Sequence, residues 1–108
     1  MISQDRLEKA MNYLATTDLK AAEWTAEAER MEFKARATKD AIFLHNPENL
    51  KTVAEREAYA GSNSEYMMAM DAYFEALQES LAVKNKRQTE ALVIDVWRSM
   101  NANRRQAA

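Results

Sequence analysis

The positions of one glycine and one proline constrain this 108-residue sequence more than any other feature. No Gly or Pro precedes Pro47, and Gly61 is the last one in the chain. Gly and Pro are the strongest interruptions of a helix, and the spaces between them are rich in the good helix formers Ala, Glu, Lys, Gln and Met. The sequence therefore predicts two long helices, over residues 3–45 and 63–104, joined by a short helix between Asn46 and Gly61. We expect an all-α fold in one domain, residues 1–108: a long antiparallel helical hairpin with a short connecting helix.

Local signals predict where these helices begin and end. Ser3 is a plausible N-cap of the first helix, and residues 16–18 (Thr-Thr-Asp) indicate a kink or a short break within it. The pair Asn46-Pro47 predicts an N-cap and first residue for the connecting helix. Gly61 has the properties of a residue just past a helix end, and residues 62–65 (Ser-Asn-Ser-Glu) match a capping box.

Apolar residues form two nearly opposite stripes on the first helix, at 100° per residue. One stripe contains Trp24, Ala28, Met31, Ala35 and Ile42, and the other contains Leu19, Ala22, Ala26, Phe33, Ala37, Ala41 and Leu44. A helix with two apolar faces is covered on two sides, once by its own chain and once by another subunit. Because a lone two-helix hairpin has little core, we expect a homo-oligomer, with a dimer favoured, that forms a helical bundle. The candidate interface residues are Trp24, Met31, Phe33 and Ile42.

The last helix carries a first apolar stripe and then a second one that is rotated by roughly a third of a turn. The first stripe contains Tyr66, Met67, Met70, Tyr73, Phe74, Leu77 and Leu81, and the methionines Met67, Met68 and Met70 are expected in the core. Antiparallel folding would bring residue 11 near residue 97. We therefore expect Leu7, Met11 and Leu14 to pack against Leu92, Val96, Trp97 or Met100.

Charge is distributed unevenly along the chain, although the net charge is only −2. Residues 1–83 hold nine Lys/Arg and fifteen Asp/Glu, whereas residues 84–108 hold six Lys/Arg and two Asp/Glu. The six cations are candidate contacts for a polyanion such as nucleic acid: Lys84, Lys86, Arg87, Arg98, Arg104 and Arg105. The alternative is a solvated helix end, where the helix dipole favours cations.

Residues suited to catalysis, metal binding or phosphate binding are scarce. The chain has no cysteine, and its single histidine, His45, lies beside Asn46-Pro47 rather than near other metal ligands. No glycine-rich phosphate loop is present. We therefore expect a non-enzymatic protein without a metal or cofactor. No apolar run approaches the ~20 residues of a membrane span, so we expect no membrane contact and a cytoplasmic location.

Three segments resemble parts of small phage-encoded helical accessory proteins, which are mostly uncharacterised. These are residues 11–18 (Met-Asn-Tyr-Leu-Ala-Thr-Thr-Asp), residues 21–24 (Ala-Ala-Glu-Trp) and residues 89–98 (Thr-Glu-Ala-Leu-Val-Ile-Asp-Val-Trp-Arg). The resemblance covers both ends of the chain and leaves out residues 46–64. It implies the cytoplasm of a bacterial host and an accessory role beside DNA transactions, and it supplies no functional residues. Two functions are expected: an oligomeric module that binds a host or phage protein or, alternatively, a nucleic-acid-binding accessory protein in phage recombination or replication.

Overall fold

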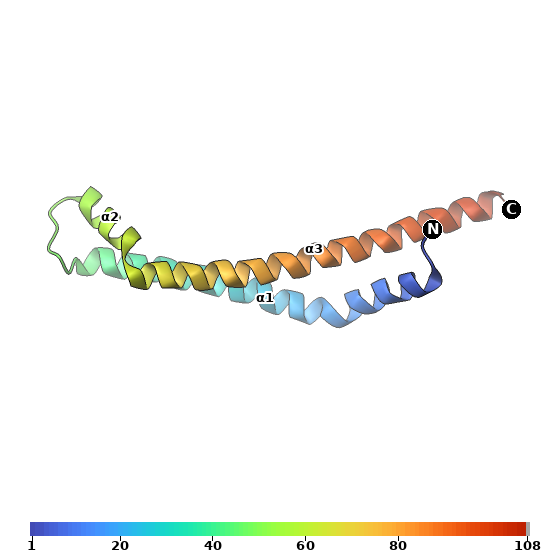
Figure 1. The fold of residues 1–108 in the computed structure, drawn as a ribbon, viewed down its shortest axis with the longest axis horizontal. Coiled ribbons are helices and arrows are strands. Elements are labelled where there is room, and N and C mark those ends of the chain that lie inside the picture. Colours follow the sequence, from blue (N-terminus) through green and yellow to red (C-terminus); the bar gives the residue numbers. More distant parts are fainter. Residues whose placement is uncertain (108) are drawn as a thin grey trace. The chain divides into compact units, whose positions relative to one another are not determined.

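Three helices make up the computed structural model, which describes residues 1–107 (Figure 1). Helix α1 spans Gln4–His45, α2 spans Val53–Ser62 and α3 spans Ser64–Ala107. No strand occurs within this described range. The predicted all-α fold, with two long helices and a short one between them, is therefore confirmed. The last helix extends three residues beyond the predicted end at residue 104.

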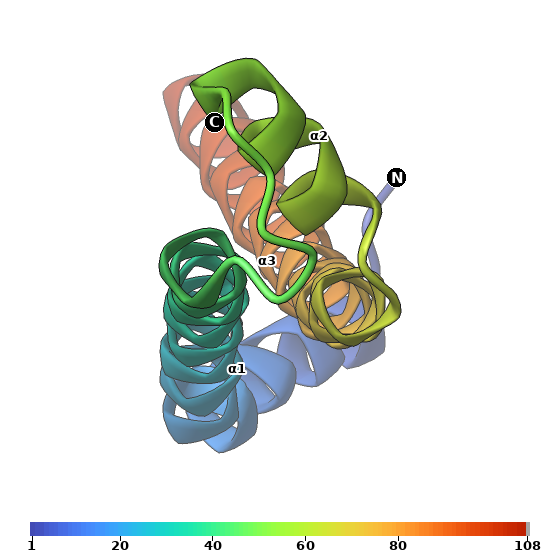
Figure 2. The same cartoon turned by 90° about the vertical axis from the view of Figure 1, so that its left-hand side faces the viewer.

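The helices pack as two compact units, each containing part of α1 and part of α3. The terminal unit consists of residues 1–23 and 81–108, of which residues up to 107 are described, and the central unit consists of residues 24–80. Each unit is an antiparallel helix pair: Arg6 lies against Glu90 in the terminal unit, and Thr25 against Ser80 in the central unit. The helical hairpin is confirmed, and the single domain stays a prediction. In the central unit α2 lies along one side of the pair (Figure 2).

Buried and half-buried side chains recur along α1 and α3 at alternating intervals of three and four residues. This is the spacing of a coiled-coil contact, and we call these positions the seam. In α1 the seam comprises Leu7, Ala10, Leu14, Thr17 and Ala21 in the terminal unit, then Trp24, Ala28, Met31, Ala35, Thr38 and Ile42 in the central unit. In α3 it comprises Tyr66, Ala69, Tyr73, Ala76 and Ser80 in the central unit, then Val83, Arg87, Glu90, Ile94, Trp97 and Asn101 in the terminal unit.

The seam buries small side chains most completely. Ala10 and Ala35 are 0% and 1% exposed. Among the described residues, Leu7 is the one large apolar side chain that is buried, with 6% of its surface exposed. The other buried apolar residues are Ala28, Ala60 and Ala76. Small residues let two helices approach closely, but they remove little apolar area from water. The core is therefore thin, and several larger apolar side chains, such as Phe33 and Leu44, are left outside it.

The start of α1 agrees with the sequence, whereas the expected break within it does not occur. Ser3 caps the helix because its Oγ accepts a hydrogen bond of 3.0 Å from the backbone N–H of Arg6. At residues 16–18 the helix continues without interruption. The hydroxyls of Thr16 and Thr17 donate to carbonyl oxygens four residues earlier, at 2.8 and 2.6 Å, so they bond within the helix instead of capping a new one. The prediction of a break at residues 16–18 is therefore wrong, and the alternative, a kink, stays a prediction.

Asn46 ends α1 instead of starting the next helix. Its φ of 47° is in the left-handed region, which Asn tolerates at a helix end. Its side chain then closes the connecting loop: Nδ2 donates to the carbonyl oxygen of Leu50 and Oδ1 accepts from the N–H of Leu50, both at 2.9 Å. Helix α2 begins only after Thr52, whose Oγ1 accepts from the N–H of Glu55 at 3.1 Å. The N-terminal roles predicted for Asn46 and Pro47 are therefore wrong.

The turn from α2 to α3 is made by Asn63. Gly61 lies inside α2 without a positive φ, because the chain leaves the helix through Asn63 in an extended conformation that needs no glycine. The side chain of Asn63 also caps α3, since its Oδ1 accepts from the N–H of Glu65 at 2.9 Å. Ser62 instead donates its hydroxyl to the carbonyl oxygen of Ala58. The predicted cap is thus displaced by one residue.

Candidate functional site

An ion pair occupies the seam of the terminal unit. The carboxylate of Glu90, a residue only 8% exposed, accepts hydrogen bonds of 2.6 and 2.9 Å from Nη1 and Nη2 of Arg6. These hydrogen bonds lower the pKa of Glu90 below its usual range, although burial of the carboxylate acts in the opposite direction. The same contact raises the pKa of Arg6. Both groups stay charged near neutral pH, and each neutralises the other.

Arg87 and Lys86, two of the predicted polyanion contacts, are engaged within the terminal unit. The guanidinium of Arg87 donates to the carbonyl oxygen of Leu14 at 3.0 Å and to Oγ1 of Thr17 at 2.8 Å. It also pairs with Asp18 at 3.2 Å, and its side chain is only 23% exposed. Nζ of Lys86 lies 4.5 Å from the ring centroid of Tyr13, a cation–π contact. Arg87 is therefore unavailable to a polyanion, and Lys86, although exposed, is held against Tyr13.

The other four predicted cations are available to a polyanion. Lys84, Arg98, Arg104 and Arg105 are exposed, and they form no hydrogen bond or ion pair with the described part of the chain. They all lie on α3 in the terminal unit. The basic surface that the sequence predicts is thus smaller than expected, but it is present.

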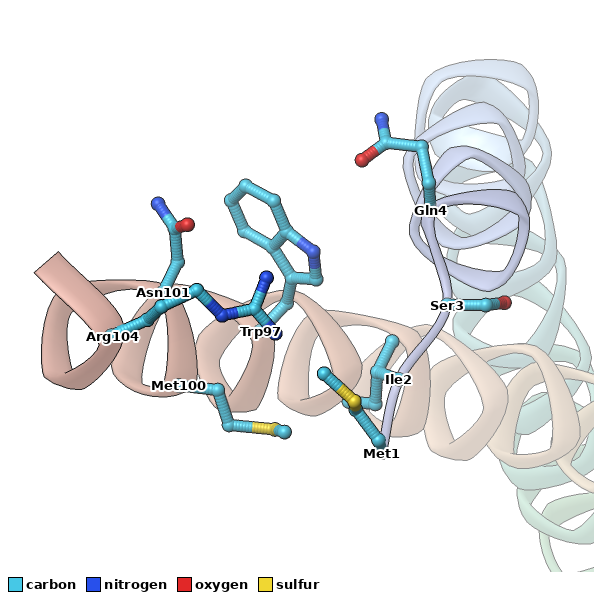
Figure 3. Close-up of a pocket in the computed structure, with 8 residues that line it drawn as sticks. All are labelled: Met1, Ile2, Ser3, Gln4, Trp97, Met100, Asn101 and Arg104. Atoms are coloured by element: carbon cyan, nitrogen blue, oxygen red, sulfur yellow. The ribbon is translucent and has the colours of Figure 1, made fainter. Parts of the chain in front are cut away.

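Arg104 also lines a pocket of about 520 Å³ beside Trp97 (Figure 3). The other wall is formed by Met1, Ile2 and Ser3, which precede α1, and by Gln4, its first residue. The pocket combines an indole, a guanidinium and the amide of Asn101, so it offers an apolar surface together with hydrogen-bond donors. Sequence reasoning missed this pocket, because Trp97 and Gln4 meet only through the antiparallel pairing.

The structure separates the four residues predicted for an oligomer interface. Trp24, Met31 and Ile42 lie at seam positions and are half-buried within the central unit. Phe33 faces outward and is 73% exposed. Both predicted apolar stripes therefore occur on α1, but only the stripe that contains Phe33 is exposed to solvent. We call its central-unit members the α1 stripe: Ala26, Phe33, Ala37, Ala41 and Leu44, of which Leu44 is 79% exposed.

A second open stripe lies on α3 in the central unit, where the sequence predicts core. The α3 stripe consists of Met67, Met70, Phe74 and Leu77. Met67 and Phe74 are 55% and 54% exposed, and Met70 and Leu77 are half-buried. Met68 is 71% exposed. The expected burial of Met67 and Met68 is therefore wrong, because the seam runs through the neighbouring Tyr66 and Ala69.

The apolar residues expected to pack together at the chain ends are buried to very different degrees. Leu7 is buried, but Met11, Leu92 and Val96 are 55%, 61% and 40% exposed. The contact between Thr17 and Arg87 shows that the pairing is displaced by about one helical turn from the expected one. A signal for the true seam was present in the sequence: the intervals of three and four residues appear once Ala, Thr, Arg and Glu are counted together with the large apolar residues.

Metal ligands do not cluster in the described range, where no three His, Cys, Asp or Glu residues could together hold an ion. No helix in this range has the length and apolar character to cross a membrane. Comparison with known proteins gives no match to a family model, a curated protein or a solved structure. The function must therefore be inferred from the open surfaces of the two units.

Proposed function

We propose that this chain is a non-enzymatic phage accessory protein that acts as an oligomeric helical protein-interaction module in the cytoplasm of a bacterial host. The resemblance of residues 11–18, 21–24 and 89–98 to phage-encoded helical proteins supports the phage origin. The scarcity of catalytic residue types in the sequence supports a binding role.

One observation carries the proposal: the most completely buried side chains are mainly alanines, whereas several larger apolar side chains are exposed. Phe33, Leu44 and Met68 are 73%, 79% and 71% exposed, whereas Ala28 and Ala76 are each only 6% exposed. Apolar residues that gather on a helix face rather than scatter singly mark sites of interaction. The central unit presents two such faces, the α1 stripe and the α3 stripe.

We assign self-association to the α1 stripe. Ala26, Ala37 and Ala41 surround Phe33, and these small residues would let a second helix approach closely while Phe33 supplies the contact area. This keeps a dimer as the favoured oligomer. It narrows the predicted interface to Phe33, because Trp24, Met31 and Ile42 already pack within their own chain.

Light scattering on the purified protein tests this assignment. The wild-type chain should have a mass above the 12.4 kDa of a monomer at about 50 μM, a range in which moderately tight dimers form. Phe33→Glu should reduce the mass toward the monomer without loss of helicity, because the side chain does not contribute to the seam. Lys34→Glu is the matched control: this exposed residue lies beside the stripe, and its substitution should leave the mass unchanged. A wild-type monomer would contradict self-association.

A second candidate function is nucleic-acid binding by the terminal unit, and the four open cations favour it. If Lys84, Arg98, Arg104 and Arg105 each meet a phosphate of duplex DNA, the logarithm of affinity should fall with the logarithm of salt concentration with a slope of about −3.6. Fluorescence anisotropy on labelled duplex and single strands at two salt concentrations measures this slope. Replacing Arg98, Arg104 and Arg105 with Gln should reduce it, and retention of DNA by this variant would exclude the basic surface.

A further inference from the structure

We propose that the α3 stripe of the central unit binds a cationic amphipathic helix of a partner protein. The inference rests on the proposed function as an interaction module and adds the chemistry of the partner. The α1 stripe then serves self-association, and the α3 stripe serves recognition.

The spacing of the stripe shows that a helix fits it. Met67, Met70, Phe74 and Leu77 follow one another at intervals of three, four and three residues. Each of them comes directly after a seam residue, so the stripe is turned by about 100° from the surface that packs on α1. The half-exposed Met67 and Phe74 alternate with the half-buried Met70 and Leu77. Anchors at this spacing are those with which one helix meets another.

Charge determines which kind of helix fits. From residue 64 to residue 83, α3 carries four acidic residues and no Lys or Arg. All four are exposed and take part in no ion pair within the described chain: Glu65, Asp71, Glu75 and Glu79. Two of them, Asp71 and Glu75, lie beside the stripe, whereas Glu65 and Glu79 lie on the opposite side of the helix at 100° per residue. A partner with Lys and Arg beside its apolar face would neutralise Asp71 and Glu75. A second copy of the α3 stripe would bring the same two acidic residues and would be repelled.

The neighbouring cations on α1 cannot take this role, because acidic residues already hold them. Arg36 pairs with Glu32. Lys39 pairs with Glu57 of α2 at 3.5 Å and lies 5.7 Å from the ring centroid of Tyr66. The acidic residues of α3 therefore remain available to a partner.

The surface around the stripe is hollowed rather than flat. A groove of about 380 Å³ lies within the central unit, and Tyr66, Met70 and Tyr73 form its α3 wall. The ring centroid of Phe74 lies 5.3 Å from that of the half-buried Tyr73, which supports the exposed ring from one side. The methionines are flexible and polarisable, so they can adapt to the side chains of a partner helix. The α1 wall of the groove is charged and consists of Glu32, Arg36, Lys39 and Asp40. The apolar anchors of the partner therefore meet the α3 wall, and Asp71 and Glu75 favour cations beside those anchors.

Two synthetic peptides test the proposal. Each is an amphipathic helix of about 18 residues, or five turns, with Leu at intervals of three and four. One carries Lys at its polar positions and the other carries Glu. Isothermal titration into the full chain should show binding of the Lys peptide, weakened by salt, and none of the Glu peptide. Phe74→Glu should lower the affinity for the Lys peptide by about tenfold or more, because a central apolar anchor is lost. Phe33→Glu is the matched control, because it makes the same change on the α1 stripe and should leave binding unchanged.

Charge reversal supplies a second variant that does not depend on an apolar anchor. Asp71→Lys with Glu75→Lys changes only exposed side chains, so the fold should persist, and the variant should prefer the Glu peptide. Equal binding of both peptides to the wild-type chain, or equal losses in the Phe33 and Phe74 variants, would overturn the proposal. A loss of oligomer mass in Phe74→Glu would also overturn it, since a second copy would then occupy the stripe. A monomeric wild type that still selects the Lys peptide would refute self-association alone.

Discussion

Arg6 and Glu90 are separated by 84 residues in the sequence and are joined by two hydrogen bonds in the seam of the terminal unit. Two parallel N–H donors require one orientation of the carboxylate, so the pair fixes the register of α1 against α3. The alanines of this seam, Ala10 and Ala21, select the register only weakly, because an alanine packs almost equally well one turn away. The ion pair supplies the selection that the alanines lack.

We expect Arg6→Ala and Glu90→Ala each to destabilise the terminal unit. Arg6→Ala should cost more, because it leaves the buried carboxylate of Glu90 without its counterion, whereas the Arg6 side chain is 39% exposed. The double variant should lose less than the sum of the two single losses. Urea unfolding followed by the fluorescence of Trp97, in a Trp24→Phe background, measures this unit alone. Asp5→Ala is the control: Asp5 pairs with Lys9, and both side chains are more than 70% exposed, so the loss should stay below about 1 kcal/mol.

Acid should weaken the terminal unit through Glu90. The pKa of Glu90 is lowered in the folded chain, so its contribution is complete above the unfolded-state value of about 4.3 and is lost as pH falls through the lower folded value. The unfolding midpoint, recorded by Trp97 fluorescence between pH 7 and pH 3 (about the range over which a carboxylate titrates), should therefore decrease most below pH 4.3. Glu90→Gln should flatten this decrease. A variant that follows the wild-type profile would assign the acid sensitivity to other carboxylates.

Arg87→Glu should destabilise the terminal unit, whereas Lys84→Glu should not. The first change removes three polar contacts and places a second carboxylate beside Asp18. The second reverses the charge of an exposed residue three positions earlier on the same helix. Circular dichroism melts of the two variants make the comparison. Equal melting temperatures would show that Arg87 has no structural role.

Enlarging a seam alanine should be costly, whereas enlarging an outer alanine should not. Ala35 is 1% exposed, so Ala35→Leu must push the helices apart or shift them, at a cost of about 1–3 kcal/mol. Ala72→Leu makes the same change at an exposed alanine of the central unit that lies outside the seam and both stripes, and it should leave the free energy of unfolding nearly unchanged. Chemical denaturation followed by Trp24 fluorescence, in a Trp97→Phe background, reports on the central unit. Similar losses in both variants would show that the two alanines are equally packed.

The long helices could be predicted from the sequence because their determinant is local: good helix formers continue for about forty residues without Gly or Pro. The ends of the connecting helix could not, since Asn46 could begin or end a helix with equal local plausibility. The outcome depended on its left-handed backbone and its two hydrogen bonds to Leu50.

The candidate surfaces could be predicted only in part. Two apolar stripes on the first helix were visible, and the one with Trp24 does form the seam. The seam of α3 was missed because its members include Ser80, Arg87 and Glu90, which an apolar pattern leaves out. Arg87 appeared to belong to a solvated basic run, since its partners Leu14 and Thr17 lie about seventy residues earlier in the chain.

The narrow seam between α1 and α3 has a consequence for how such a sequence can change. Its residues recur at intervals of three and four along each helix, so a narrow strip of each helix fixes the pairing. Side chains on the rest of each helix surface do not hold α1 and α3 together. Substitutions there can alter what the protein recognises while the strip stays constant, and the same backbone can serve a succession of binding partners.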